Sequence, residues 1–451
     1  MQVSEETRKA YASGESVKSM RIFFPDINLT IENNKIHSET MVLKESLMEG
    51  NNVEFVGCIA SSFEVTVHGV LTDLKNQRIE VYIKADNTEE IPLFHGIVNS
   101  AKMQTNKNYK KIVAYDELPA RGNIDVAGWY KGLAFPISLR DLRDSLFSYI
   151  GIVQAEKELP NDEVIIDRQY APNTLQALSV IKAICQINGA FGIINRKNKF
   201  EYRILKEMFE EDDSFPPLYP PFYPGTMFGG GSGTVIITED FAFYRSVDYE
   251  EYMVKPVERV TIRQSAEDPG VTYGDGTNNY IIQANMFATG LSTDILMSIA
   301  ENIHDSIAGI SFQPFSATNN GMPWIEVGES SARYTVVDYS ALENEKQKAR
   351  ESESIPYTEK NFYIFNRELK GIQSLTDNYK VQGDEYQTEF VTDLQTQIDS
   401  IKSDTQQIVN NTVKDYTYSK QEIDDMSKSW YRIVTAKPDT FEQGVIYFVR
   451  K

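Results

Sequence analysis

Cysteine and long apolar runs are scarce in this sequence. Its two cysteines, Cys58 and Cys185, lie in apolar surroundings without metal-ligand spacing, which favours two buried thiols over a disulfide or a redox pair. No run of about twenty apolar residues occurs, and the N-terminal stretch has no apolar segment behind a basic start. We therefore expect neither a membrane span nor a cleaved signal, and a protein that is made and folded in the cytoplasm.

Sequence motifs of known catalytic chemistry are also missing. The glycine-rich stretch GGGSGT has neither the spacing of a GxSxG nucleophile elbow nor the GK[ST] of a P-loop. The acidic run at 210–213 could bind a divalent cation, but four consecutive acids favour a solvated patch. The stretch at 274–279 lacks the remaining ligands of a calcium loop, which favours a simple turn. The histidines stand outside any HExxH pattern: His37, His68, His95 and His304. We predict a protein that is not an enzyme and that holds no cofactor and no metal. A pair of glycosidase carboxylates stays open, because such a pairing is spatial.

Basic residues are outnumbered by acidic ones. The chain has 65 Asp and Glu against 45 Lys and Arg, a formal net charge of -20 at pH 7. Neutralising phosphates requires clustered Lys and Arg, so no specific nucleic-acid binding is expected. An acidic surface repels DNA, which suits a protein that DNA slides past. With 451 residues and 41% hydrophobic content, the chain is long enough for roughly two to four domains.

The first predicted domain is an all-β barrel over residues 1–115. Apolar residues recur at every second position in short runs, as in strands. Asn-rich and Gly-rich turns separate the runs at intervals expected of a closed or nearly closed antiparallel barrel. The runs are MRIFFPDINLTI, VEFVGCIA, SFEVTVHGVL, RIEVYIKA, IPLFHGIVNSAKM and KKIVAYD.

A small α+β domain is predicted over residues 116–207. Two helices are expected, one capped by Ser138 and one by Asn173, each burying one face. The expected inward residues are Leu139, Leu142, Leu146, Ile150, Leu175, Leu178, Ile181 and Cys185. The following AFGIINRKNKFEYRIL indicates a hairpin whose turn is 196–198.

Residues 208–234 are rich in Pro, Tyr and Phe and then in Gly, which predicts a loop without regular structure. Exposed aromatic side chains are costly in water unless they pack on a neighbour. The segment is therefore either a contact with another subunit or protein, or a linker lying over its own surface; both remain open. The candidate contact residues are Phe215, Tyr219, Phe222, Tyr223 and Phe228.

Two more domains are expected before residue 385. Residues 235–310 form a strand–helix middle domain, in which Ser292 caps a helix running to about His304. The inward residues of this helix should be Ile295, Ile299 and Ile303. In 311–385, the alternation in IEVGESSARYTVV is similar to that in VEFVGCIASSFEVTV and predicts a second barrel resembling the first.

A heptad repeat is predicted over 386–415. Its mostly β-branched core positions favour three strands over two. Since about three heptads are marginal alone, neighbouring folded modules should hold the strands in register. A single amphipathic helix packed on its own domain is disfavoured, because two core positions are threonines. The seam residues are Val391, Leu394, Ile398, Ile401, Thr405, Ile408 and Thr412.

The last segment, 416–451, is predicted to be a fibre-like attachment module. It contains a short helix candidate and two strands, YRIVTA and VIYFVR. Two strands alone do not form a stable domain. They would be stable as a three-chain bundle of hairpins, or as a socket completed by another protein, with Tyr431 and Phe448 as candidate contacts.

Three segments carry a resemblance to a known family. They are IPLFHGIVNSAKMQTNKNYKKIVAYDELP, TLQALSVIKAICQINGAFGIINRKNKFEYRIL and NFYIFNRELKGIQSLTDNYKVQGDE, in that order. Over about residues 20–385 the chain resembles the prophage tail or baseplate hub (tail-tip) proteins of phages infecting Gram-positive bacteria, which are related in fold to the hub of contractile tails. YSKQEIDDM followed by IYFVRK similarly resembles the end segments of phage fibre proteins.

The resemblance implies a mainly β fold with α+β insertions. Two similar barrels per subunit and three subunits per ring give a pseudo-sixfold ring matching the sixfold tail tube. The implied function is a structural hub in the virion, assembled in the bacterial host cytoplasm, through which DNA or cargo passes. The implied partners are the tail tube or a distal tail protein above, a spike, fibre or tip protein at the C-terminal end, the tape-measure protein and the host cell envelope.

Two other functions stay open. One is a tail-associated peptidoglycan hydrolase, although a lytic activity carried by longer relatives is not transferred to a sequence that ends at Lys451. The other is an adhesin whose aromatic loop binds host glycan, because tyrosines stack on sugars.

Overall fold

The computed structural model describes residues 3–48, 57–104, 108–167, 173–209, 234–238, 243–328, 331–337, 357–383, 389–392, 431–434 and 446–449. The chain divides into two compact units, Met1–Thr392 and Asp393–Lys451. The first unit is called the body below. In the described part of the chain, no helix combines the length and the apolar character needed to cross a bilayer.

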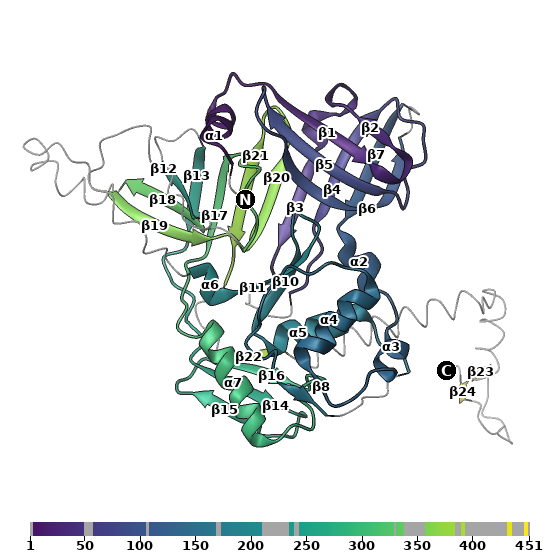
Figure 1. The fold of residues 1–451 in the computed structure, drawn as a ribbon, viewed down its shortest axis with the longest axis vertical. Helices are drawn as coiled ribbons and strands as arrows, with labels where there is room; N and C mark the ends of the chain where they lie inside the picture. The colour runs from purple at the N-terminus through teal and green to yellow at the C-terminus, as the bar shows by residue number, and fades with distance from the viewer. Residues whose placement is uncertain are drawn as a thin grey trace, which may run out of the picture. The chain divides into compact units, whose positions relative to one another are not determined.

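An 11-stranded sheet organises the body (Figure 1). All of its neighbouring strands are antiparallel. In order across the sheet they are β13 (Tyr244–Tyr249), β17 (Phe315–Asn320), β21 (Thr376–Val381), β20 (Asn366–Lys370), β3 (Val42–Ser46), β4 (Ser62–His68), β7 (Tyr109–Tyr115), β6 (Ile91–Met103), β5 (Arg78–Ala85), β1 (Lys18–Phe24) and β2 (Leu29–Ile31).

The predicted strands of the N-terminal region are largely confirmed. Every second residue is buried along β1 and β5, as a strand with one face on the core requires. The run VEFVGCIA is the exception, since its described part, 57–60, makes only an isolated bridge from Cys58 to Gly192. Strand β3 was not expected, because its inward side chains are Leu43 and a charged residue, Glu45, and an inward Glu hides the apolar alternation.

Neither predicted barrel is closed among the described strands. The strands of the first region and three strands of the second, β17, β20 and β21, instead belong to one sheet, joined where β20 pairs with β3. After β2, the chain reaches β4 through a single bridge, Ile36 to Val67, and a hydrogen bond of 2.9 Å from the His37 N–H to the Thr66 carbonyl. The first region is therefore a strongly curved sheet whose ends meet at one point.

The α+β region follows its prediction with one shift. Helix α4 (Leu139–Ile150) begins after Ser138, whose hydroxyl accepts a hydrogen bond from the Asp141 N–H, and its four expected inward residues are buried. Helix α5 (Ala177–Ile187) has Gln176, not Asn173, as its N-cap. The hairpin is present as β10 (Ala190–Ile194) and β11 (Phe200–Ile204). Shorter elements are α2 (Glu117–Gly122), α3 (Ala127–Lys131), β8 (Ile137–Ser138), β9 (Ile165–Ile166) and α6 (Leu205–Phe209).

The middle region packs a helix on a small sheet. Helix α7 (Thr293–Ile307) lies against β14 (Arg259–Arg263) and β15 (Val271–Gly274) (Figure 1). Beside β14 lie β16 (Asn279–Gln283) and then β22 (Glu389–Thr392), both parallel to it. Ile299 and Ile303 are buried as expected, but Ile295 is 38% exposed and Leu296 is the buried residue of that turn. The expected inward position was wrong by one residue.

The remaining strands correct two expectations. IEVG, 325–328, is not a strand but a buried turn segment, and the strand nearby is β18 (Ser331–Val337), between β12 (Thr234–Thr238) and β19 (Tyr357–Tyr363). In the second unit, β23 (Tyr431–Val434) and β24 (Ile446–Val449) are present as predicted, but they pair in parallel, whereas a hairpin requires antiparallel strands. Helix α1 (Glu5–Ala12) was not predicted.

Asp116 connects the sheet to the α+β region. It follows β7 and caps α2, accepting hydrogen bonds from the Leu118 N–H (2.9 Å) and the Ser61 N–H (2.7 Å). Only 2% of its surface is exposed. Burial raises the pKa of Asp116 to about 7, against the lowering effect of the two N–H donors.

Replacing Asp116 with Asn tests this titration. Because the folded chain raises the pKa, folding favours the protonated carboxyl. The stability that this preference contributes is present below the ordinary value of 3.8 and is lost as the pH rises through about 7. Between about pH 5 and about pH 8, urea unfolding should show wild type losing about 3 kcal/mol more than Asp116→Asn. Identical pH dependence of the two proteins would contradict the prediction.

Candidate functional site

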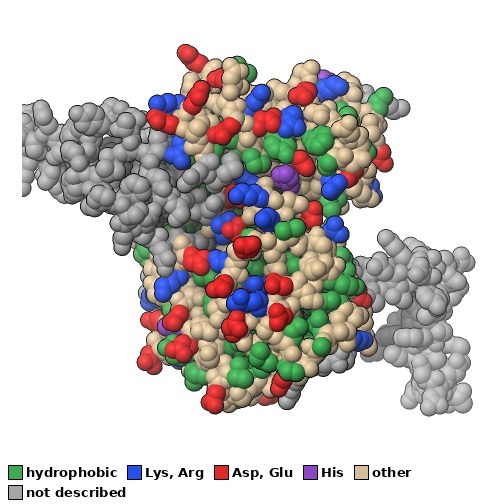
Figure 2. Space-filling model, viewed as in Figure 1, with side chains coloured by type: hydrophobic (Ala, Val, Ile, Leu, Met, Phe, Trp, Pro, Cys, Tyr) green, Lys and Arg blue, Asp and Glu red, His purple; other side chains and the backbone are tan. Residues whose placement is uncertain are grey.

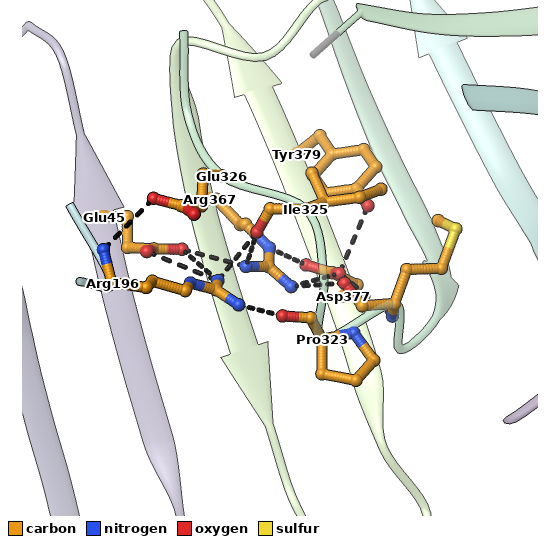
Figure 3. Close-up of polar contacts among 9 residues, drawn as sticks. Glu45, Arg196, Pro323, Ile325, Glu326, Arg367, Asp377 and Tyr379 are labelled. Atoms are coloured by element: carbon orange, nitrogen blue, oxygen red, sulfur yellow. Dashed lines mark hydrogen bonds and ion pairs between the residues drawn. The ribbon is translucent and has the colours of Figure 1, made fainter. Parts of the chain in front are cut away.

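Buried charged side chains meet where the two halves of the large sheet join (Figure 3). Glu45 comes from β3, Arg367 from β20, Asp377 from β21 and Arg196 from the turn between β10 and β11. Each of the four is at most 8% exposed. We call Glu45, Arg196, Arg367 and Asp377 the ionic junction.

The pairing of β20 with β21 sets the first contact. Arg367 lies opposite Tyr379, so Asp377 stands two residues along on the same face. The guanidinium binds the Asp377 carboxylate with two parallel hydrogen bonds, Nε to Oδ1 and Nη2 to Oδ2, each 2.8 Å long. Tyr379 also donates its hydroxyl to Asp377 Oδ2 at 3.1 Å. Such a bidentate contact fixes the orientation of the guanidinium as well as neutralising its charge.

The pairing of β20 with β3 adds the second carboxylate. Glu45 lies directly opposite Arg367, and Arg367 Nη1 is 2.9 Å from Glu45 Oε2. Glu45 and Arg367 are 322 positions apart in the sequence. The register of the sheet where β3 meets β20 is therefore specified by an ion pair as well as by the backbone hydrogen bonds.

The turn of the β10–β11 hairpin supplies Arg196. The turn is tight, with Asn198 in a left-handed conformation at φ 55. Arg196 Nη2 lies 3.1 Å from Glu45 Oε2, so Glu45 is shared by both arginines. The hairpin of the α+β region is thereby tied to the sheet.

Residues 322–328 complete the junction. This segment is not a strand, so its carbonyl groups have no ladder partners and accept hydrogen bonds from the guanidiniums. Arg367 donates to the carbonyls of Met322, at 2.9 Å, and of Ile325. Arg196 donates to the carbonyls of Pro323 and, at 2.7 Å, of Ile325.

The electrostatics of the junction depend on how its buried charges are paired, and of its side-chain polar atoms only Arg196 Nε is buried without a hydrogen bond. Burial alone would raise the pKa of Glu45, but Arg196 and Arg367 lower it below its ordinary value. The pKa of Arg367 is raised, because the charges of Asp377 and Glu45 outweigh its loss of water. An ion pair taken out of water repays its desolvation only when every lone pair and N–H is matched. Removing one member therefore leaves a buried charge without its partner.

The chemistry of the junction is structural. Glu45 and Asp377 are both paired with arginines, and an arginine does not exchange protons at physiological pH. Among the residues that the structure describes, no three His, Cys, Asp or Glu side chains are grouped so that they could hold a metal ion. On the face drawn in Figure 2, acidic and basic side chains are interspersed over the described surface.

The structure describes few of the site residues expected from the sequence. Of the heptad seam, only Val391 is described, and it lies in β22, opposite Ile281 of β16. It is thus part of a sheet and not the start of a coiled coil, as its β-branched side chain allows. The other seam residues and Phe215, Tyr219, Phe222, Tyr223 and Phe228 lie outside the described residues. Tyr431 lies in β23 opposite Ile446, and Phe448 lies in β24 opposite Ile433, so these two aromatic residues are two positions out of register.

The ionic junction was not predicted from the sequence. Its four members are spread from residue 45 to residue 377, and none stands in a motif. The one available signal was Arg367 and Asp377, charged residues inside apolar strand patterns that are 10 positions apart.

No family model matches the sequence, and no curated protein is similar to it. Similar solved structures include a tail protein from Neisseria meningitidis MC58, with 13% identity, 82% of this chain and 99% of that chain covered and a TM-score of 0.44. Another is the 43 kDa tail protein of prophage MuSo2 from Shewanella oneidensis, with 10% identity, 81% of this chain and 98% of that chain covered and a TM-score of 0.46. A third is the prophage tail protein gp18 from Listeria monocytogenes EGD-e, with 9% identity, 81% of this chain and 95% of that chain covered and a TM-score of 0.43. These matches do not support the expected restriction to phages of Gram-positive bacteria.

The substitution Glu45→Gln tests the junction. It keeps the shape of the side chain but removes the charge that both arginines share, so the free energy of unfolding should fall by about 3 kcal/mol. The matched control is Glu368→Gln on the neighbouring strand β20, whose partners Lys44 and Lys370 are exposed. A change within about 0.5 kcal/mol is expected there. Urea unfolding measures both, and equal effects would contradict a special role for Glu45.

Proposed function

We propose that this chain is a structural hub protein of a phage or phage-like tail. In this proposal three copies cap the sixfold tail tube as part of the virion. Their C-terminal segments connect the tube to a distal spike, fibre or tip protein, and DNA or cargo passes through the ring. The protein performs no catalysis in this role.

The observation that carries the proposal is where the segments resembling hub proteins meet. The second segment, 174–205, contributes Arg196, and the third, 361–385, contributes Arg367 and Asp377. Arg196 and Arg367 both bind Glu45, and Arg367 also binds Asp377 directly. The first segment contains β6 and β7, which lie in the same sheet as β20 and β21. The resemblance therefore covers one connected structural unit and not three unrelated stretches.

The charge of the chain supports a role beside passing DNA. A net charge of -20 opposes adhesion of phosphate-rich polymers. Because the same charge disfavours DNA binding, the proposed partners are proteins. They are the tail tube or a distal tail protein above, the distal spike, fibre or tip protein below, and the tape-measure protein during assembly.

The proposed domain arrangement keeps the boundaries expected from the sequence except at the coiled coil. Because β22 pairs with β16 through Thr392, the trimeric helix is proposed to begin after Thr392. Six seam residues remain available to it: Leu394, Ile398, Ile401, Thr405, Ile408 and Thr412. Residues 416–451 remain the proposed attachment module.

The trimer is tested by a charge placed in the seam. Ile401→Asp puts a carboxylate where three helices would bury it, a cost of several kcal/mol that a short repeat cannot offset. Native mass spectrometry should find three chains for wild type and one for Ile401→Asp. Ser403→Asp, on the outer side of the same heptad, should remain a trimer. Wild type that is monomeric at micromolar concentration would refute the trimer.

The connector role is tested by truncation after Thr392, which retains β22 and with it the sheet of the middle region. The shortened chain should match the full chain in the urea midpoint of the body. Tail particles assembled with it should lack density distal to the ring in electron micrographs. Particles that keep their distal spike or fibre would contradict the role of 393–451 as the connector.

A further inference from the structure

The only two cysteines of the chain lie side by side in the body. Cys58 and Cys185 are 127 positions apart, yet their Sγ atoms are 3.5 Å from each other. Both are free thiols, with 6% and 0% of their surface exposed. Cys58 precedes β4 of the large sheet, and Cys185 lies in α5 of the α+β region.

Strand β10 holds the two thiols together. The chain at Cys58 is bound to it by a bridge to Gly192, whose N–H donates to the Gly57 carbonyl at 3.1 Å. Helix α5 packs on the same strand. A Cβ on Gly192 would lie 2.8 Å from Cys58 Sγ and 3.1 Å from Cys185 Sγ, so glycine at this position leaves the space in which both sulfurs fit.

We propose that Cys58 and Cys185 are a built-in site of reversible disulfide formation, reduced while the chain folds in the cytoplasm and oxidised by peroxide outside it. A disulfide has an S–S length of about 2.05 Å, so the sulfurs need to approach by only about 1.5 Å. Rotation about the Cα–Cβ bonds is the movement that would bring the two sulfurs together. The chemistry of the two thiols goes beyond the tail role, and only the change of compartment rests on that role.

The oxidation balances with one molecule of hydrogen peroxide. The thiolate of one cysteine attacks the O–O bond, giving a sulfenic acid, and the released hydroxide becomes water. The second thiol then attacks the sulfenic sulfur, forming the S–S bond and releasing a second water. Cys58 is the more exposed of the two and reacts first. Burial raises the pKa of Cys185, so Cys185 serves as the resolving thiol.

The disulfide would change stability more than structure. It closes a loop of 127 positions, and a long loop restricts the unfolded chain strongly. The bond would also tie the sheet to the α+β region at β10, so separation of these parts would require reduction.

The experiment treats the full-length wild-type chain, freed of reductant, with millimolar hydrogen peroxide under native conditions. Thiols are then counted after denaturation, and the intact mass and the linked peptides are determined. Both thiols should be lost together, and the Cys58 and Cys185 peptides should be linked within one chain. The intact mass should fall by about 2 Da. The thermal midpoint should rise by several degrees, and dithiothreitol should reverse this rise.

Cys58→Ala and Cys185→Ala serve as controls that should show no change of midpoint with peroxide. Two thiols that stay free while glutathione in the same tube is fully oxidised would overturn the proposal. So would a disulfide that forms only in denaturant, one that links separate chains, or one that lowers the midpoint. The wild-type thiol count decides the matter even if a variant fails to fold.

Discussion

The shared carboxylate of Glu45 is the contact on which the arrangement of the body depends. Two buried guanidiniums, Arg196 and Arg367, both bind this carboxylate. Each also donates hydrogen bonds to backbone carbonyls of 322–328. Apolar side chains could fill the same volume with similar stability, but they would not specify which strand stands beside which. The ionic junction fixes the register of β20 on β3 and the position of the β10–β11 hairpin at once.

The same hairpin is anchored at two points. Its turn reaches the sheet through Arg196, and the middle of β10 contacts Cys58 through Gly192. A small hairpin held in this way transmits displacement between the α+β region and the sheet instead of absorbing it. In a protein proposed to sit between a tail tube and a distal attachment, such a joint would keep the ring geometry constant while force is applied at one end.

Patterns with a local cause were read correctly from the sequence. The helix after Ser138, the hairpin turn at 196–198 and most strands before residue 116 follow from capping, turn chemistry and alternation. The errors occur where tertiary contacts override the pattern. Glu45 made β3 look polar, Ile295 faces outward although it is apolar, and IEVG alternates like a strand but forms a turn whose carbonyls bind arginine.

By itself, the sequence determined the mainly β character, the positions of the principal helices, the acidic charge and the heptad pattern that underlies the proposed trimer. These properties depend on neighbouring residues or on composition. Tertiary structure alone decided that strands from both regions meet in one sheet, that Val391 lies in an edge strand, and that four charged residues and two thiols from distant segments become neighbours. Pairing between residues hundreds of positions apart leaves no periodicity along the chain, because its cause is the burial that only the folded chain creates.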